Sequence, residues 1–110
     1  MEISARQIGE VVLLDVHGEI DLYNAPQLKT AVDQVVAGGQ LKVVVNLARC
    51  SYLDSTGIGI LVHCVSEVAR RGGLLKLQSP SASLMQVFQM TRLLSHFDIR
   101  ESEDDAVSSF

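Results

Sequence analysis

Short apolar runs rich in β-branched residues alternate along this chain with segments whose apolar residues recur at helical spacing. Residues 11–17 and 41–47 are predicted to be strands. Each is followed by a series with apolar side chains three and four positions apart, over residues 28–36 and 58–69. Such alternation is typical of an α/β layer fold. We therefore predict a mixed β-sheet of four to five strands with about four helices packed against it.

Turn and capping residues predict where these elements begin and end. Asn24 is predicted to cap the first helix together with Gln27, and the glycines at 38–39 end that helix. Residues 48–53 are predicted to be a link, and a third helix opens at Ser79 and Pro80. Shorter elements complete the prediction: strands at 74–77 and 97–100 and a terminal helix at 103–107.

Composition excludes several classes of protein. The chain has 110 residues, 47% of them hydrophobic and 20% charged, which suits one cored domain and argues against intrinsic disorder. Nine Lys and Arg against 13 Asp and Glu give a net charge of −4, so no basic field exists for nucleic acid. There is neither a signal-peptide pattern nor an apolar run of the ~20 residues that span a bilayer. We expect a cytoplasmic protein with no direct membrane insertion.

The two cysteines do not form a recognisable chemical motif. Cys50 and Cys64 are 14 positions apart and no CxxC pattern is present, so neither a disulfide framework nor a zinc or redox site is indicated. Cysteine in a well-cored domain behaves as a small hydrophobic residue. We expect both to be free thiols, buried or half-buried.

The segment at 54–59 reads Asp-Ser-Thr-Gly-Ile-Gly and places a carboxylate, two hydroxyls and two glycines within six positions. It falls where a helix is predicted to begin, and a helix start offers unsatisfied N–H groups and the positive end of a dipole. That suits an anion, either on a ligand or as a phosphoryl group on Ser55 or Thr56. The alternative is a plain capped helix start, because Asp, Ser and Thr are favoured caps. The residues alone leave both interpretations open.

No catalytic or metal-binding arrangement is indicated. A nucleophile elbow requires glycine two positions before and two after the serine, and Ser55 has Leu53 at the first of these. No lysine follows Gly57 or Gly59 as a P-loop requires. The three histidines, His17, His63 and His96, are scattered. We therefore predict no enzyme activity, no catalytic residue, no metal and no cofactor.

Two spaced motifs resemble a known family. Residues 43–47 (Val-Val-Val-Asn-Leu) and 52–61 (Tyr-Leu-Asp-Ser-Thr-Gly-Ile-Gly-Ile-Leu) resemble the signature of the STAS domain, and more narrowly that of the bacterial anti-sigma-factor antagonists. Residues 18–21, Gly-Glu-Ile-Asp, resemble the family's second motif, and residues 87–97 with the acidic 103–106 fit its closing pattern. The resemblance covers the chain in order and implies a single STAS domain over residues 1–110.

The resemblance implies a phosphorylation switch. In such antagonists the serine after the motif aspartate is phosphorylated by the anti-sigma factor, a serine kinase, and a serine phosphatase reverses this. The unphosphorylated form binds the kinase and releases the sigma factor. By position, Ser55 is the phosphoacceptor, with Thr56 the second candidate, and Asp54 and Asp21 lie on the same surface. Asn46 departs from the pattern, because the family usually carries Asp there, and it is expected to remove a negative charge near the switch.

The partner surface is predicted to continue along the second helix. Gly57 and Gly59 are expected to allow close approach of a partner, and Gly59, His63, Ser66 and Arg70 form a stripe opposite the apolar one. A solvated helix face is the alternative for this stripe. The alternative function is a STAS subunit or scaffold of a transporter or stress-signalling assembly. The free chain is expected to be a monomer.

Overall fold

Residues 1–110 of the computed structural model form a five-stranded mixed sheet, as predicted. The strands lie in chain order: β1 (Glu2–Ile8), β2 (Val11–Ile20), β3 (Lys42–Leu53), β4 (Leu74–Gln78) and β5 (Asp98–Arg100). β1 runs antiparallel to β2, and every later pair is parallel. The parallel pairs require crossover connections, which the helices supply.

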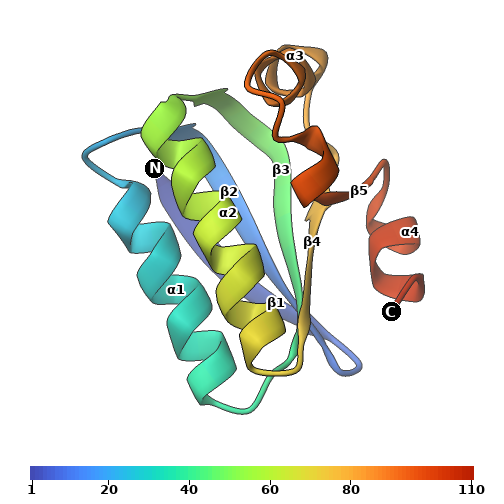
Figure 1. The fold of residues 1–110 in the computed structure, drawn as a ribbon. Helices are drawn as coiled ribbons and strands as arrows, with labels where there is room; N and C mark the ends of the chain where they lie inside the picture. The colour runs from blue at the N-terminus through green and yellow to red at the C-terminus, as the bar shows by residue number, and fades with distance from the viewer.

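Helices cover both faces of this sheet (Figure 1). α1 (Ala25–Ala37) and α2 (Ser55–Arg70) pack side by side on one face, and α4 (Glu103–Ser108) lies on the other. α3 (Ala82–Met90) and the 3-10 turn η1 (Leu94–His96) lie near one end of the sheet, where α3 contacts β3. The predicted four helices are therefore confirmed.

Two cores follow from the alternation of side chains along the central strands. Val12, Leu14 and Val16 point to α1 and α2 and belong to a cluster of 22 buried residues. Val11 and Leu13 point the other way and form a small cluster with Val44 and Ala106 beneath α4. Because both faces of β2 and β3 are covered, their apolar runs are nearly continuous.

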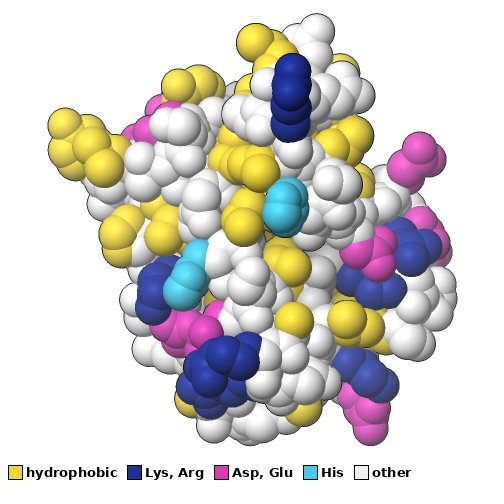
Figure 2. All heavy atoms as spheres, viewed as in Figure 1, with side chains coloured by type: hydrophobic (Ala, Val, Ile, Leu, Met, Phe, Trp, Pro, Cys, Tyr) yellow, Lys and Arg dark blue, Asp and Glu magenta, His cyan; other side chains and the backbone are white.

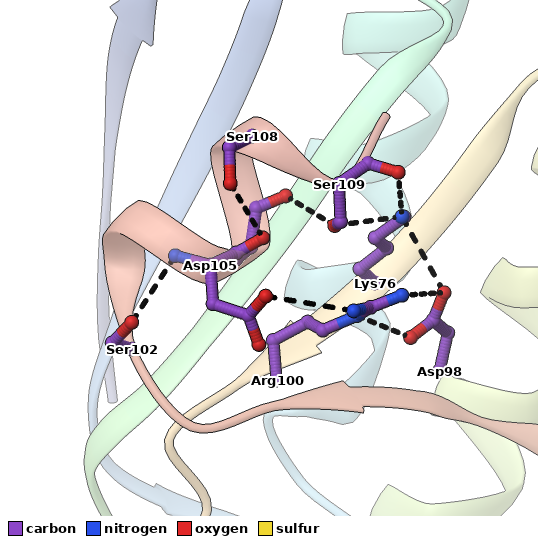
Figure 3. Close-up of polar contacts among 8 residues, drawn as sticks. Lys76, Asp98, Arg100, Ser102, Asp105, Ser108 and Ser109 are labelled. Carbon is purple, nitrogen blue, oxygen red and sulfur yellow. Dashed lines mark hydrogen bonds and ion pairs between the residues drawn. The ribbon is translucent and has the colours of Figure 1, made fainter.

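A buried lysine anchors α4 to the sheet (Figure 3). The Lys76 ammonium donates to the carbonyl and hydroxyl oxygens of Ser109, both at 2.8 Å, and lies 3.5 Å from a carboxylate oxygen of Asp98. It also lies 4.6 Å from the centre of the Phe110 ring. These contacts satisfy a cation that is only 4% exposed, and so hold the end of the chain on the sheet.

The structure has one strand that the sequence prediction missed and two that are longer than predicted. β1 lacks a clear apolar pattern because it lies at the sheet edge and only Met1 and Ile3 in this region are half-buried. β2 continues through residues 18–20, and the predicted link at 48–53 is strand, paired with β2 as far as Leu53. Only Cys50 and Leu53 are buried in that stretch, which hid its strand character.

Two helix starts also differ from the prediction. The Asn24 side chain makes no capping bond to α1, and Gln27 does not complete a capping box. Instead, the Asp21 carboxylate accepts from the backbone N–H groups of Tyr23 and Asn24. α3 is capped by Ser81, whose hydroxyl accepts from the Leu84 N–H, and not by Ser79.

Both cysteines are buried free thiols, as expected. Burial raises the pKa of Cys64 to about 12 and also raises the pKa of Cys50. The reactive thiolate is therefore scarce at neutral pH, and both residues serve packing.

Candidate functional site

Asp54 joins the start of α2 to the loop between β2 and α1. One carboxylate oxygen accepts from the Gly57 N–H at 2.8 Å, which caps the helix, and the other accepts from the Leu22 N–H at 3.0 Å. The Asp54 N–H donates to the Ile20 carbonyl at 3.2 Å. Asp54 is half-buried, and both carboxylate oxygens are used inside the protein. Asp54 therefore connects the motif at residues 52–61 with the motif at residues 18–21.

The loop on the other side of this junction is held by its own polar side chains. Asp21 accepts from the N–H groups of Tyr23 and Asn24 at 2.9 and 3.1 Å. Asn24 accepts from the Asp21 N–H and donates to the Glu19 carbonyl. Asp21 thus lies in the loop that Asp54 contacts, and its carboxylate folds that loop. A rigid loop presents its remaining side chains in fixed positions.

Ser55 is the first residue of α2 and its side chain is exposed, whereas Thr56 is half-buried. The N–H groups of Asp54 and Gly57 are bonded to Ile20 and to the Asp54 carboxylate. Among the first four amides of the helix, those of Ser55 and Thr56 therefore remain to bind an external acceptor. The first turn of α2 therefore holds the exposed side chain of Ser55 and two amides without a partner inside the protein.

Gly57 has an internal role that differs from the predicted one. It is buried, and a Cβ there would lie 2.8 Å from the Ile20 carbonyl oxygen and 2.8 Å from a Leu53 methyl carbon. The glycine therefore lets α2 approach the ends of β2 and β3. Gly59, in contrast, is exposed and has nothing within 4 Å of its Cβ position.

The helix face that continues from Ser55 is open to solvent. Gly59 and His63 follow Ser55 by four and eight positions, and both are exposed, as are Ser66 and Arg70 farther along the stripe. The opposite face of α2 is buried and includes Cys64. Val62 and Val65, which belong to the apolar series predicted from the sequence, are only half-buried. The predicted orientation of the exposed stripe is thus confirmed.

Two exposed apolar side chains beside this point were missed in the sequence. Leu22 is 60% exposed and Tyr23 is 89% exposed, and both belong to the loop that Asp54 holds. Figure 2 shows hydrophobic side chains projecting over that loop. The available signal was a pair of large apolar residues between the turn-forming Asp21 and Asn24, where burial is not expected.

Asn46 lies away from this surface, so the expectation of a charge change near the switch is wrong. It is in the middle of β3, where its side-chain amide donates to Asp15 at 2.8 Å and its oxygen accepts from the Ala48 N–H. Asp15 is bound on its other side by Arg6. Asn46 therefore belongs to a polar cluster on the sheet face that carries α4, opposite to α2.

The histidines and acidic side chains form no metal-binding group. His17, His63 and His96 are all exposed and lie on separate elements. No group of three or more His, Cys, Asp or Glu side chains could hold a metal ion. None of the helices has the length and apolar character that crossing a membrane would require.

Comparison with known proteins agrees with this arrangement. The model of the STAS domain family matches residues 2–106. The anti-sigma-B factor antagonist of Bacillus subtilis (strain 168) is 32% identical over 108 residues, which cover 97% of each chain. An anti-sigma factor antagonist from Mycobacterium paratuberculosis has a crystal structure that superposes with a TM-score of 0.87, at 25% identity, over 98% of this chain and 92% of that one.

A third protein shares the fold. The Bacillus cell fate determinant SpoIIAA, solved in its phosphorylated form, matches with a TM-score of 0.73 and 23% identity over 98% of both chains. The family model and the B. subtilis relative each cover nearly all of the sequence. The chain belongs to the STAS domain family, in the group of the anti-sigma factor antagonists.

Proposed function

We propose that this protein binds a kinase-type anti-sigma factor through the start of α2 and the β2–α1 loop, and that phosphorylation of Ser55 by that kinase ends the binding. The observation that carries the proposal is the position of Ser55. Ser55 is the first residue of α2, its side chain is exposed, and it lies beside the loop that presents Leu22 and Tyr23. A serine phosphatase would return the protein to its binding form.

Exposure favours Ser55 over Thr56 as the acceptor. Ser55 is exposed whereas Thr56 is half-buried, and a kinase must surround the hydroxyl that it modifies. Asp54 cannot turn toward the phosphoryl group without losing its bonds to Gly57 and Leu22. The scaffold around the acceptor therefore stays fixed while the charge at position 55 changes.

The added charge is compatible with the fold. A phosphoryl group brings about −1.5 to −2 charges. The dipole of α2 and the free amides of the first turn favour that charge by roughly 0.3–1 kcal/mol. Phosphorylation is therefore expected to leave α2 intact.

The same charge opposes a bound partner. An anchor such as Tyr23 gains affinity by being desolvated in the partner's pocket. A phosphoryl group at the neighbouring Ser55 would have to lose its hydration in the same interface, at a cost of several kcal/mol when it is imperfectly paired. Because each 1.4 kcal/mol is about tenfold in affinity, the switch needs no change of fold.

The assignment of the acceptor is tested by mass spectrometry. Incubation with ATP and a recombinant anti-sigma factor kinase of the same organism should add one phosphate, and fragment spectra should place it on Ser55. Thr56→Ala serves as the matched control and should accept phosphate as the wild type does. Undiminished phosphorylation of Ser55→Ala would refute the assignment.

A further inference from the structure

The outer edge of β1 is not covered by any element of this fold. β1 pairs only with β2, through seven consecutive residue pairs without a register shift. The opposite edge strand, β5, has three residues and packs beside α4. Proteins usually protect an edge with proline, a bulge, a covering element or charged side chains. β1 has no proline and no bulge, and its charged residues are Glu2 and Arg6. Its unpaired N–H and C=O groups can accept another strand.

A groove lies beside the same strand on the α1 face of the sheet. It has a volume of about 700 Å³ and is lined by Ile3 and Ala5 of β1 and by α1 residues that include Ala31 and Val35. Ile3 is only half-buried and Ala5 is exposed, so the β1 side of this groove remains accessible to a partner. The edge therefore offers an apolar surface in addition to its backbone groups.

We infer that β1 pairs antiparallel with β1 of a second copy of this chain, across a two-fold axis that places Ser4 opposite Ser4. Residues directly opposite each other in a sheet point to the same face, so a symmetric pair of β1 strands must be centred on one residue. Centring the pair on Ser4 places Glu2 opposite the second copy's Arg6, and the symmetry repeats this contact. Ile3 then lies opposite Ala5 on the groove side.

The other possible centres lack this complementarity. Centring on Arg6 would bring two guanidinium groups together, and centring on Ile3 or Ala5 pairs no opposite charges. Arg6 is already held on the sheet by Asp15, at 2.6 and 2.9 Å, and by Glu103. Because Asp15 and Glu103 already neutralise much of the Arg6 charge, the contact with Glu2 adds little affinity and mainly selects the register. Backbone hydrogen bonds and the apolar contact between Ile3 and Ala5 supply most of the affinity of the dimer. The proposed dimer is weak and concentration-dependent, so it is compatible with a monomer at low concentration.

Cysteine cross-linking tests the register. Residues opposite each other in an antiparallel pair have Cα atoms about 4.5–5.5 Å apart, and a disulfide spans about 4.4–6.8 Å. Ser4→Cys should therefore form a disulfide-linked dimer under mild oxidation, whereas Ala5→Cys and Gln7→Cys should not. The natural cysteines are buried and do not interfere. Cross-linking of Ser4→Cys no faster than of Gln7→Cys would overturn the inference.

Charge reversal tests the contact between Glu2 and Arg6. In analytical ultracentrifugation, Glu2→Arg should raise the dimer Kd at least about tenfold, because two attractive pairs become repulsive. Glu101→Arg, the same change at an exposed site away from the edge, should leave the Kd unaltered. Equal effects of the two variants, or a wild type that stays monomeric at its solubility limit, would contradict the proposal. A dimer that survives Glu2→Arg would indicate a different surface.

Discussion

The carboxylate of Asp54 accepts a hydrogen bond from the backbone N–H of Leu22 at 3.0 Å, across the gap between α2 and the β2–α1 loop. Its other oxygen caps α2 through the Gly57 N–H. One side chain thus sets the position of Ser55, at the helix start, relative to Leu22 and Tyr23, in the loop. The relative position of Ser55 and the loop therefore depends on both hydrogen bonds of the Asp54 carboxylate.

Replacing Asp54 should therefore affect both stability and the loop. Asp54→Ala should lower the free energy of unfolding by about 1–3 kcal/mol, because it removes a helix cap and one bond to the loop. Amide hydrogen exchange should become faster at Leu22 and Gly57. Glu101→Ala, at an exposed position, serves as the control in urea unfolding. Unchanged exchange at Leu22 in Asp54→Ala would show that the loop is held by Asp21 alone.

The two glycines of the motif should respond in opposite directions. Gly57→Ala introduces a Cβ only 2.8 Å from the Ile20 carbonyl oxygen and should destabilise the protein by about 1–3 kcal/mol. Gly59→Ala meets no atom within 4 Å and should stabilise it by up to about 1 kcal/mol, because alanine is the better helix former. Urea denaturation of the pair provides the measurement. Loss of stability in both variants would mean that α2 is packed differently on its outer side.

Acid should weaken the protein partly through Asp15. The Arg6 guanidinium, bonded to the Asp15 carboxylate, holds the pKa of that group below its usual range, and the amide of Asn46 adds to the effect. A carboxyl group whose pKa is lower in the folded than in the unfolded protein stabilises the fold at pH values above its unfolded pKa, which is near 3.9. That stabilisation is lost as the pH falls through the folded-state pKa. Stability measured at several pH values should fall less steeply below about pH 4 in Asp15→Asn than in the wild type. An identical slope would remove Asp15 from the acid response.

The sequence predicted those features that local periodicity controls. The helical spacing at 28–36 and 58–69 and the apolar runs at 11–17 and 41–47 each correspond to an element. The alternation of these elements predicted the mixed sheet. Cys50 and Cys64 were correctly expected to be buried, since a thiol in a cored domain packs as a hydrophobic residue.

Features that depend on neighbours distant in the sequence could not be predicted. β1 is defined by its pairing with β2 and not by an apolar pattern of its own. Asn46 was expected near the switch because the family usually carries Asp at that position, but its side chain points to the sheet face that carries α4. Gly57 looked available to a partner, yet its space is filled by Ile20 and Leu53, which only the folded chain brings together.

The most direct test of the switch is calorimetric titration of the anti-sigma factor kinase with wild-type protein, Ser55→Ala and Ser55→Asp. Ser55→Ala should bind within about tenfold of the wild type, because it loses at most one modest hydrogen bond. Ser55→Asp should bind at least about tenfold more weakly, since it leaves a carboxylate uncompensated in the interface. Circular dichroism should be the same for all three, because a carboxylate at a helix start does not oppose the helix. Unchanged or tighter binding of Ser55→Asp would contradict the proposed switch.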